Sequence, residues 1–115
     1  MDEQRARELL ARERARIEHE LSELQPEFDP DSADTLTETT DEVDEHLYDK
    51  ERDIGRIAEL REELAAVERA EKRLEEGTYG LSVESGEPIP DGRLELLPTA
   101  ERTTQEQDRF ERLGR

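Results

Sequence analysis

Carboxylates crowd one short segment of this chain and are its strongest candidates for chemistry. Residues 26–51 contain eleven Asp and Glu and one Lys, which is a net charge of −10 out of −17 for all 115 residues. Carboxylates at this density can pair with Arg or Lys of a partner or coordinate magnesium. The uneven charge indicates a local binding device, and the alternative is a solvated connection between two elements.

The other reactive side chains do not form a catalytic set. Ser82 and Ser85 have no accompanying base that would make either a nucleophile, and the chain has no cysteine for a disulfide or a thiolate metal site. His19 and His46 lie on the two expected long helices, where we expect both to be exposed. We therefore predict that the protein is not an enzyme.

The composition limits the fold and the surroundings of the protein. With 30% hydrophobic, 3% aromatic and 44% charged residues, the chain cannot bury a large core, but it can bury a narrow apolar seam between long helices. No apolar run is long enough to span a membrane, and the charged N-terminus does not resemble a secretory signal. We expect a cytoplasmic protein with a positively charged partner and no direct DNA binding, because phosphates repel this charge.

A helix is predicted over residues 1–25, and Pro26 ends it because proline cannot continue the hydrogen-bond ladder. Arg14 occupies a seam position between two apolar residues of this helix. The apolar seam follows a three-four spacing: Leu10, Ile17, Leu21 and Leu24.

A second helix is predicted over about 41–76, with Thr40 or Asp41 as its N-cap and Gly77 just past its end. Its seam also follows helical spacing: Leu47, Ile54, Ile57, Leu60, Leu64, Val67 and Leu74. The two helices most simply fold back as an antiparallel coiled-coil hairpin (1–76), so that the segment at about 26–45 forms an exposed acidic tip. Such a hairpin buries its own seam, which favours a monomer.

The composition of residues 77–115 predicts a separate small lobe. Glycines and prolines mark short turns over 77–100, and residues 101–113 predict a short polar helix with Phe110 and Leu113 available to dock. The lobe has a small apolar set: Tyr79, Leu81, Val83, Ile89, Leu94, Leu96 and Leu97. The predicted fold class is mainly α: a long hairpin, a small lobe and a short C-terminal helix.

The lobe resembles the DksA/TraR family of bacterial transcription regulators. The matching stretches are GTYG at 77–80, SGEPIP at 85–90 and RLELLPTA at 93–100, in the family's order and spacing over about 30 residues. That family's lobe follows a coiled-coil hairpin, and its pattern is G-x-Y-G-x-C-x-x-C-G-x-x-I, then R-L-x-x-x-P, then C-x-x-C. The resemblance implies a zinc-finger-like lobe in which four cysteines bind zinc.

This chain departs from the family at those four ligand positions, which fall on Ser82, Ser85, Thr103 and Glu106. Two serines, a threonine and one carboxylate do not replace four thiolates around a structural zinc ion. We therefore expect a zinc-free lobe with no metal and no cofactor, held by its apolar residues, with side-chain hydrogen bonds at the former ligand positions as an added support.

The resemblance also implies a partner and a mechanism. Members of the family bind RNA polymerase directly, insert the hairpin through its secondary channel and bring acidic tip residues close to the active centre, often together with ppGpp. The family's D-x-x-D tip matches Asp41 and Asp44, with Glu42 and Glu45 beside them, and His46 stands where the family often has Ala. Asp29, Asp31 and Asp34 are competing tip residues.

Two other functions remain open on the sequence. The hairpin could be a coiled-coil interaction module with another partner, or the protein could be an acidic mimic of nucleic acid that binds other basic partners.

Overall fold

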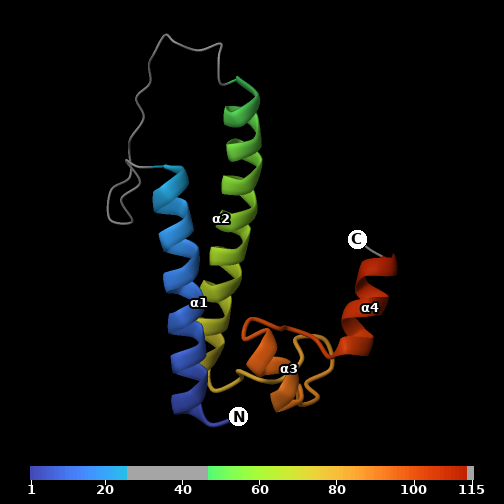
Figure 1. The fold of residues 1–115 in the computed structure, drawn as a ribbon. Coiled ribbons are helices and arrows are strands. Elements are labelled where there is room, and N and C mark those ends of the chain that lie inside the picture. Colours follow the sequence, from blue (N-terminus) through green and yellow to red (C-terminus); the bar gives the residue numbers. More distant parts are fainter. Residues whose placement is uncertain (26–46, 114–115) are drawn as a thin grey trace.

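The computed structural model describes residues 1–25 and 47–113. Within them lie four helices, α1 (Glu3–Leu24), α2 (Leu47–Glu76), α3 (Asp91–Leu96) and α4 (Thr104–Leu113), and one isolated antiparallel bridge between Leu81 and Pro88. Helices α1 and α2 lie side by side and antiparallel, and the lobe with α3 and α4 sits beside the end of the hairpin that holds the N-terminus (Figure 1). The predicted mainly helical fold, with a hairpin and a small lobe, is confirmed.

The ends of the hairpin helices follow from local hydrogen bonds. Helix α1 begins after Asp2, whose carboxylate accepts the backbone N–H of Arg5 at 3.3 Å, so the helix matches its predicted range. Helix α2 is described from Leu47 to Glu76, and its predicted start at about residue 41, with Thr40 or Asp41 as the N-cap, lies outside the described residues. Gly77 has φ +83°, and the N–H of Thr78 donates to the carbonyl of Arg73 at 2.9 Å, which confirms glycine as the end of the helix.

The hairpin core is a narrow seam, as the spacing predicts. It consists of the buried side chains Ile17, Leu21, Leu60 and Val67, with Leu24, Ile57 and Leu64 packed against them. The prediction that Ile54 extends this seam is wrong, because its side chain is 66% exposed. Ile54 lies nearly one turn beyond Ile57 along α2, where α1 has already ended at Leu24 and offers no surface to pack against. The side chain of Leu47 lies outside the described part of the chain.

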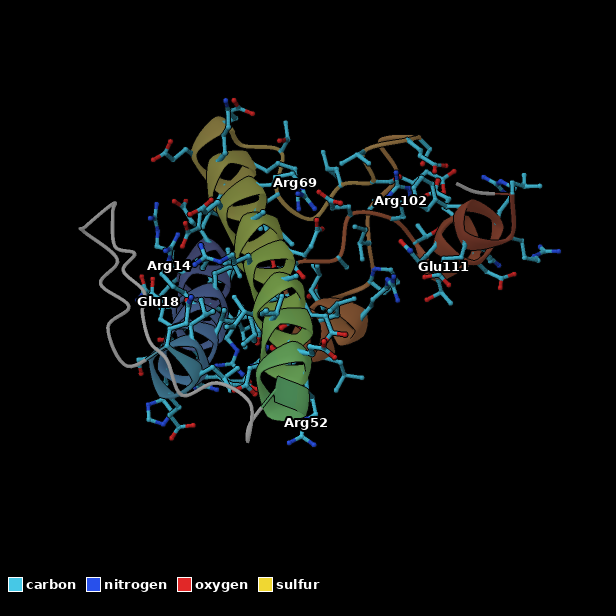
Figure 2. All side chains as sticks on the ribbon, turned by 90° about the horizontal axis from the view of Figure 1, so that it is seen from above. Arg14, Glu18, Arg52, Arg69, Arg102 and Glu111 are labelled. Carbon is cyan, nitrogen blue, oxygen red and sulfur yellow. The ribbon has the colours of Figure 1, made fainter. Side chains whose placement is uncertain are left out.

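Ion pairs flank the seam and connect the two helices. Arg14, at its predicted seam position, binds Glu71 of α2 through two contacts of 2.7 and 3.1 Å and also reaches Glu18 of α1 at 3.1 Å (Figure 2). Arg56 of α2 binds Glu20 of α1 in the same two-contact manner, at 2.8 and 2.9 Å. Half-exposed pairs of this kind contribute little stability each, but their fixed geometry favours one register of the hairpin.

The lobe has a core of its own that is smaller than predicted. Ile89, Leu94 and Ala100 are buried, and Met1 and Tyr79 pack against them. Four residues of the predicted apolar set are instead exposed, and Leu96 is the most exposed of them at 89%. They are Leu81, Val83, Leu96 and Leu97. A lobe this short has only one inner face, and α3 presents Leu94 to it.

Two further predictions for the lobe need correction. Residues 91–96, predicted as turns, form the short helix α3, which follows Pro90. Helix α4 begins at Thr104, three residues later than predicted, and its Leu113 remains exposed where docking is predicted. Phe110 is partly exposed and contacts the lobe through the guanidinium of Arg102. Figure 1 shows α4 at the side of the lobe away from the hairpin, where neither helix of the hairpin covers it.

Candidate functional site

The predicted acidic tip lies outside the described residues. This applies to Asp41, Glu42, Asp44 and Glu45 and to the competing aspartates, Asp29, Asp31 and Asp34. The structure does place the helix ends that this segment joins in sequence. The C-terminal end of α1 and the N-terminal end of α2 lie at the same end of the hairpin, away from the lobe (Figure 1).

The two histidines differ in what the structure describes. His19 is exposed on α1, as predicted, and its Nε2 lies 3.2 Å from a carboxylate oxygen of Glu23, one turn along the helix. His46 lies outside the described residues. In the part of the chain that is described, no three His, Cys, Asp or Glu side chains gather in a way that could hold a metal ion.

The other predicted site residues come together in the lobe around one carboxylate. The hydroxyl of Ser82 donates to Oε1 of Glu106 at 2.6 Å, and the hydroxyl of Ser85 donates to Oε2 at 2.6 Å. The backbone N–H of Thr103 donates to Oε1 at 3.0 Å, while the hydroxyl of Thr103 accepts the backbone N–H of Glu106 at 3.2 Å. Four residues from two separate stretches thus form one hydrogen-bonded group, which we call the Glu106 cluster.

The serine hydroxyls in this cluster both donate and accept hydrogen bonds. While donating to Glu106, the Ser82 oxygen accepts the backbone N–H groups of Glu84 and Ser85 at 3.0 and 3.2 Å. The Ser85 oxygen accepts the N–H of Glu87 at 3.2 Å. A hydroxyl has one hydrogen to donate and two lone pairs, so Ser82 uses its full capacity. The turn at 82–87 is therefore built around these two oxygens.

Glu106 is the unusual member of the cluster, because it is a charged residue with only 7% of its surface exposed. Hydrogen bonds from the Ser82 hydroxyl, the Ser85 hydroxyl and the Thr103 amide lower the pKa of Glu106 from 4.5 to about 2. Among residues 1–25 and 47–113, no Arg or Lys forms an ion pair with it. Neutral donors alone hold this carboxylate in its ionised form.

A second set of contacts surrounds the cluster. The Arg102 guanidinium lies 3.8 Å from the centre of the Phe110 ring and donates to Glu84 at 2.7 Å. Arg93 of α3 donates to the carbonyl of Arg102 at 2.9 Å. These contacts connect α3, the turn at 82–87 and α4, so that the cluster lies where all three meet.

The lobe is joined to the hairpin mainly by charged contacts. Arg5 of α1 binds both carboxylate oxygens of Glu95 in α3, at 2.8 and 2.9 Å. Glu101 accepts from Arg69 of α2 at 2.8 Å and from Arg73 at 3.1 Å, and Arg69 points from α2 toward the lobe (Figure 2). Burial opposes the ionisation of Glu101, but the hydrogen bond from Arg69 and the nearby guanidinium charges outweigh it and lower the pKa.

Replacing Glu101 by glutamine is expected to lower the free energy of unfolding by about 1–3 kcal/mol, since it weakens the ion pair between Glu101 and the largely buried guanidinium of Arg73. Urea denaturation at pH 7 measures the change. The lowered pKa means that this stabilisation is complete above the ordinary value of 4.5 and is lost as the pH falls below it, so the two proteins converge in acid. Glu87→Gln, at an exposed position, is the control, and equal denaturation midpoints for both variants would contradict the expectation.

A solved structure decides the family of this chain. The transcription factor DksA2 of Pseudomonas aeruginosa matches it with a TM-score of 0.70 and 31% sequence identity, over 96% of this chain and 84% of that chain. The chain belongs to the DksA/TraR family. A DksA/TraR member with no cysteine at all is a variant of that family without the thiolate ligands of its lobe.

Two curated proteins are similar to this chain in sequence, and one of them is a DksA. The RNA polymerase-binding transcription factor DksA of Caulobacter vibrioides is 36% identical over 95 residues, which are 83% of this chain and 63% of that protein. The Bacillus subtilis protein YteA is 48% identical over 54 residues, 47% of this chain and 23% of that protein. The chain therefore spans less than two thirds of the length of either relative. No family model matches the chain.

The Glu106 cluster does not suit the structural zinc that a DksA/TraR lobe implies. Its hydroxyls are neutral, and both of its carboxylate oxygens already accept hydrogen bonds. Structural zinc takes four thiolate or imidazole ligands, and none is present among these residues. No step of the proposed function is therefore assigned to a metal in this lobe.

Some contacts of the lobe are not predicted from the sequence, although one of them has a clear sequence signal. Thr103 and Glu106 form a capping box, in which a threonine and the glutamate three residues later satisfy each other's backbone N–H. The spacing T-x-x-E predicts a helix that starts at Thr104, where α4 does start. Arg5 with Glu95, and Arg69 with Glu101, have no such local signal because the partners are far apart in sequence.

Proposed function

We propose that this protein is a non-enzymatic transcription regulator that binds bacterial RNA polymerase directly. The observation that carries the proposal is the match to DksA2 over 96% of the chain, which includes both the hairpin and the lobe. The Caulobacter relative is itself an RNA polymerase-binding transcription factor by name, which supports the same partner. A monomer in the cytoplasm is the form in which we expect the protein to act.

The hairpin is the part that we propose to enter the secondary channel of the polymerase. Two antiparallel helices with a buried seam form a narrow rod, because their apolar side chains face each other and leave a polar exterior. Two ion pairs, Arg14–Glu71 and Arg56–Glu20, connect the two helices of the hairpin. They support a rod of defined geometry and not a loose pair of helices. Such a rod can deliver the residues at its far end to a site deep inside a partner.

The carboxylates between α1 and α2 are the groups that we propose to act at the polymerase active centre. Asp41 and Asp44, with Glu42 and Glu45, belong to the segment that connects the helix ends away from the lobe. Carboxylates there can form charge-assisted hydrogen bonds with Arg or Lys, or contact magnesium through oxygen. The action is electrostatic and needs no covalent step, with ppGpp as a further ligand of the polymerase complex.

The binding test is co-purification of the tagged full chain with core RNA polymerase, at low and moderate salt. We expect the polymerase to be retained at both, because a folded hairpin docked in a channel also makes uncharged contacts. Binding to many nucleic-acid-binding proteins that disappears at moderate salt would instead indicate an acidic mimic of nucleic acid. Retention of a different complex without polymerase would indicate a coiled-coil module for another partner and would overturn the proposal.

A further inference from the structure

The lobe of this protein must be held together without the thiolates of its family, and the structure indicates how. Family resemblance assigns the four ligand positions to Ser82, Ser85, Thr103 and Glu106, which are separated in sequence by up to 24 residues. The structure brings all four into contact in the Glu106 cluster. We propose that this cluster replaces the metal ion as the internal cross-link of the lobe, with the Glu106 carboxylate joining α4 to the turn at 82–87.

The geometry of the cross-link supports this assignment. Each oxygen of Glu106 accepts a hydrogen bond of 2.6 Å from a different serine, so the carboxylate bridges the two ends of the Ser82–Ser85 turn. Hydrogen bonds to a charged acceptor are shorter and stronger than those between neutral groups. A metal ion would lie between the four positions and bind all of them. In this lobe the Glu106 side chain, itself at one of the four positions, contacts the other three instead.

Burial makes the cross-link costly to break. Ser82 is 5% exposed, so removing the carboxylate leaves the hydrogen of its hydroxyl without an acceptor in a place that water barely reaches. Glu106 itself has no cationic partner among the described residues, so its charge depends on the three donors of the cluster. The group is therefore satisfied only when α4 and the turn are docked together.

Helix α4 has few other anchors, which is why this cross-link decides its position. Beyond its first turn it contacts the lobe through Phe110, beneath Arg102, and through Arg109, whose guanidinium lies 3.6 Å from Glu84. The remaining apolar residue of its last turn, Leu113, is exposed. Loss of the Glu106 cluster should release α4 while the hairpin, whose core is separate, stays folded.

Amide hydrogen exchange of the full chain tests the cross-link, and polymerase binding is not part of the readout. In Glu106→Ala, the amides of residues 104–113 are expected to exchange at least about tenfold faster, while those in the middle of α1 and α2 keep their rates. The matched control is Glu111→Ala on the exposed part of the same helix. Equal exchange in the two variants would overturn the proposal. Ser85→Ala removes a single donor of the cluster and serves as the second variant if Glu106→Ala unfolds the whole lobe. Faster exchange of residues 104–113 in Ser85→Ala than in the wild type then supports the cross-link. Exchange in Ser85→Ala at the wild-type rate overturns it.

The same readout tests independence from metal. Wild-type protein dialysed against EDTA, and then supplied with zinc chloride, is expected to show unchanged exchange over 77–113 at each stage. Loss of protection after EDTA that zinc restores would overturn the proposal, because a bound metal would then hold the lobe. The experiment measures folding alone, so it can fail or succeed whether or not the protein binds RNA polymerase.

Discussion

Replacing Leu60 by alanine is expected to lower the free energy of unfolding by about 2–5 kcal/mol. Leu60 is fully buried in the hairpin seam among Ile17, Leu21 and Val67, so the truncated side chain leaves a cavity that its neighbours fill only in part. A domain of this kind has about 5–15 kcal/mol of stability in total. The variant is therefore expected to unfold at a clearly lower temperature and urea concentration than the wild type.

Thermal and urea denaturation followed by circular dichroism at 222 nm measure this change. The matched control is Ile54→Ala, which removes an aliphatic side chain from the same helix at an exposed position and should change stability by no more than about 0.5 kcal/mol. A similar loss in both variants would contradict the assignment of the seam. It would mean that Ile54 also packs against a partner helix.

Asp41→Asn/Asp44→Asn is expected to keep binding to RNA polymerase and to lose most of its effect on transcription, about tenfold or more. Asparagine keeps the size of aspartate but removes the charge, and each charge-assisted hydrogen bond lost is worth roughly 1.5–3 kcal/mol. This prediction rests on the proposed function. In vitro transcription on a promoter that responds to the wild-type protein measures the effect, with polymerase retention measured in parallel.

The matched control for the tip changes the same number of charges at the other end of the rod. Glu75→Gln/Glu76→Gln alters two exposed carboxylates in the last turn of α2, beside the lobe. Its effect on transcription should equal that of the wild type. Unchanged transcription effects in the Asp41 and Asp44 variant, with intact polymerase binding, would exclude these two residues as the acting tip and would direct attention to Asp29, Asp31 and Asp34.

The hairpin and the lobe differ in how far the local sequence determines which side chains are buried. In the hairpin, the spacing of Ile17, Leu21, Leu60 and Val67 predicts the buried face, because helical periodicity alone brings such residues to one side. Gly77 marks the end of α2 for an equally local reason, its left-handed backbone. In the lobe, hydrophobicity alone does not predict burial, since Leu94 is buried and Leu96 is exposed within the same short helix.

The sequence by itself determines three features: the order of the motifs in the lobe, the apolar seams and the acidic segment. Together they predict a helical hairpin with a small lobe that resembles the DksA/TraR family. Which charged side chains meet was decided only by the tertiary structure. Glu106 meets Ser82, and Arg5 meets Glu95, across 24 and 90 residues of chain. Local propensity carries no information about such pairs, because a carboxylate on an isolated segment has its hydrogen bonds satisfied by water. Only the packing of α4 and α3 determines which protein donors replace that water.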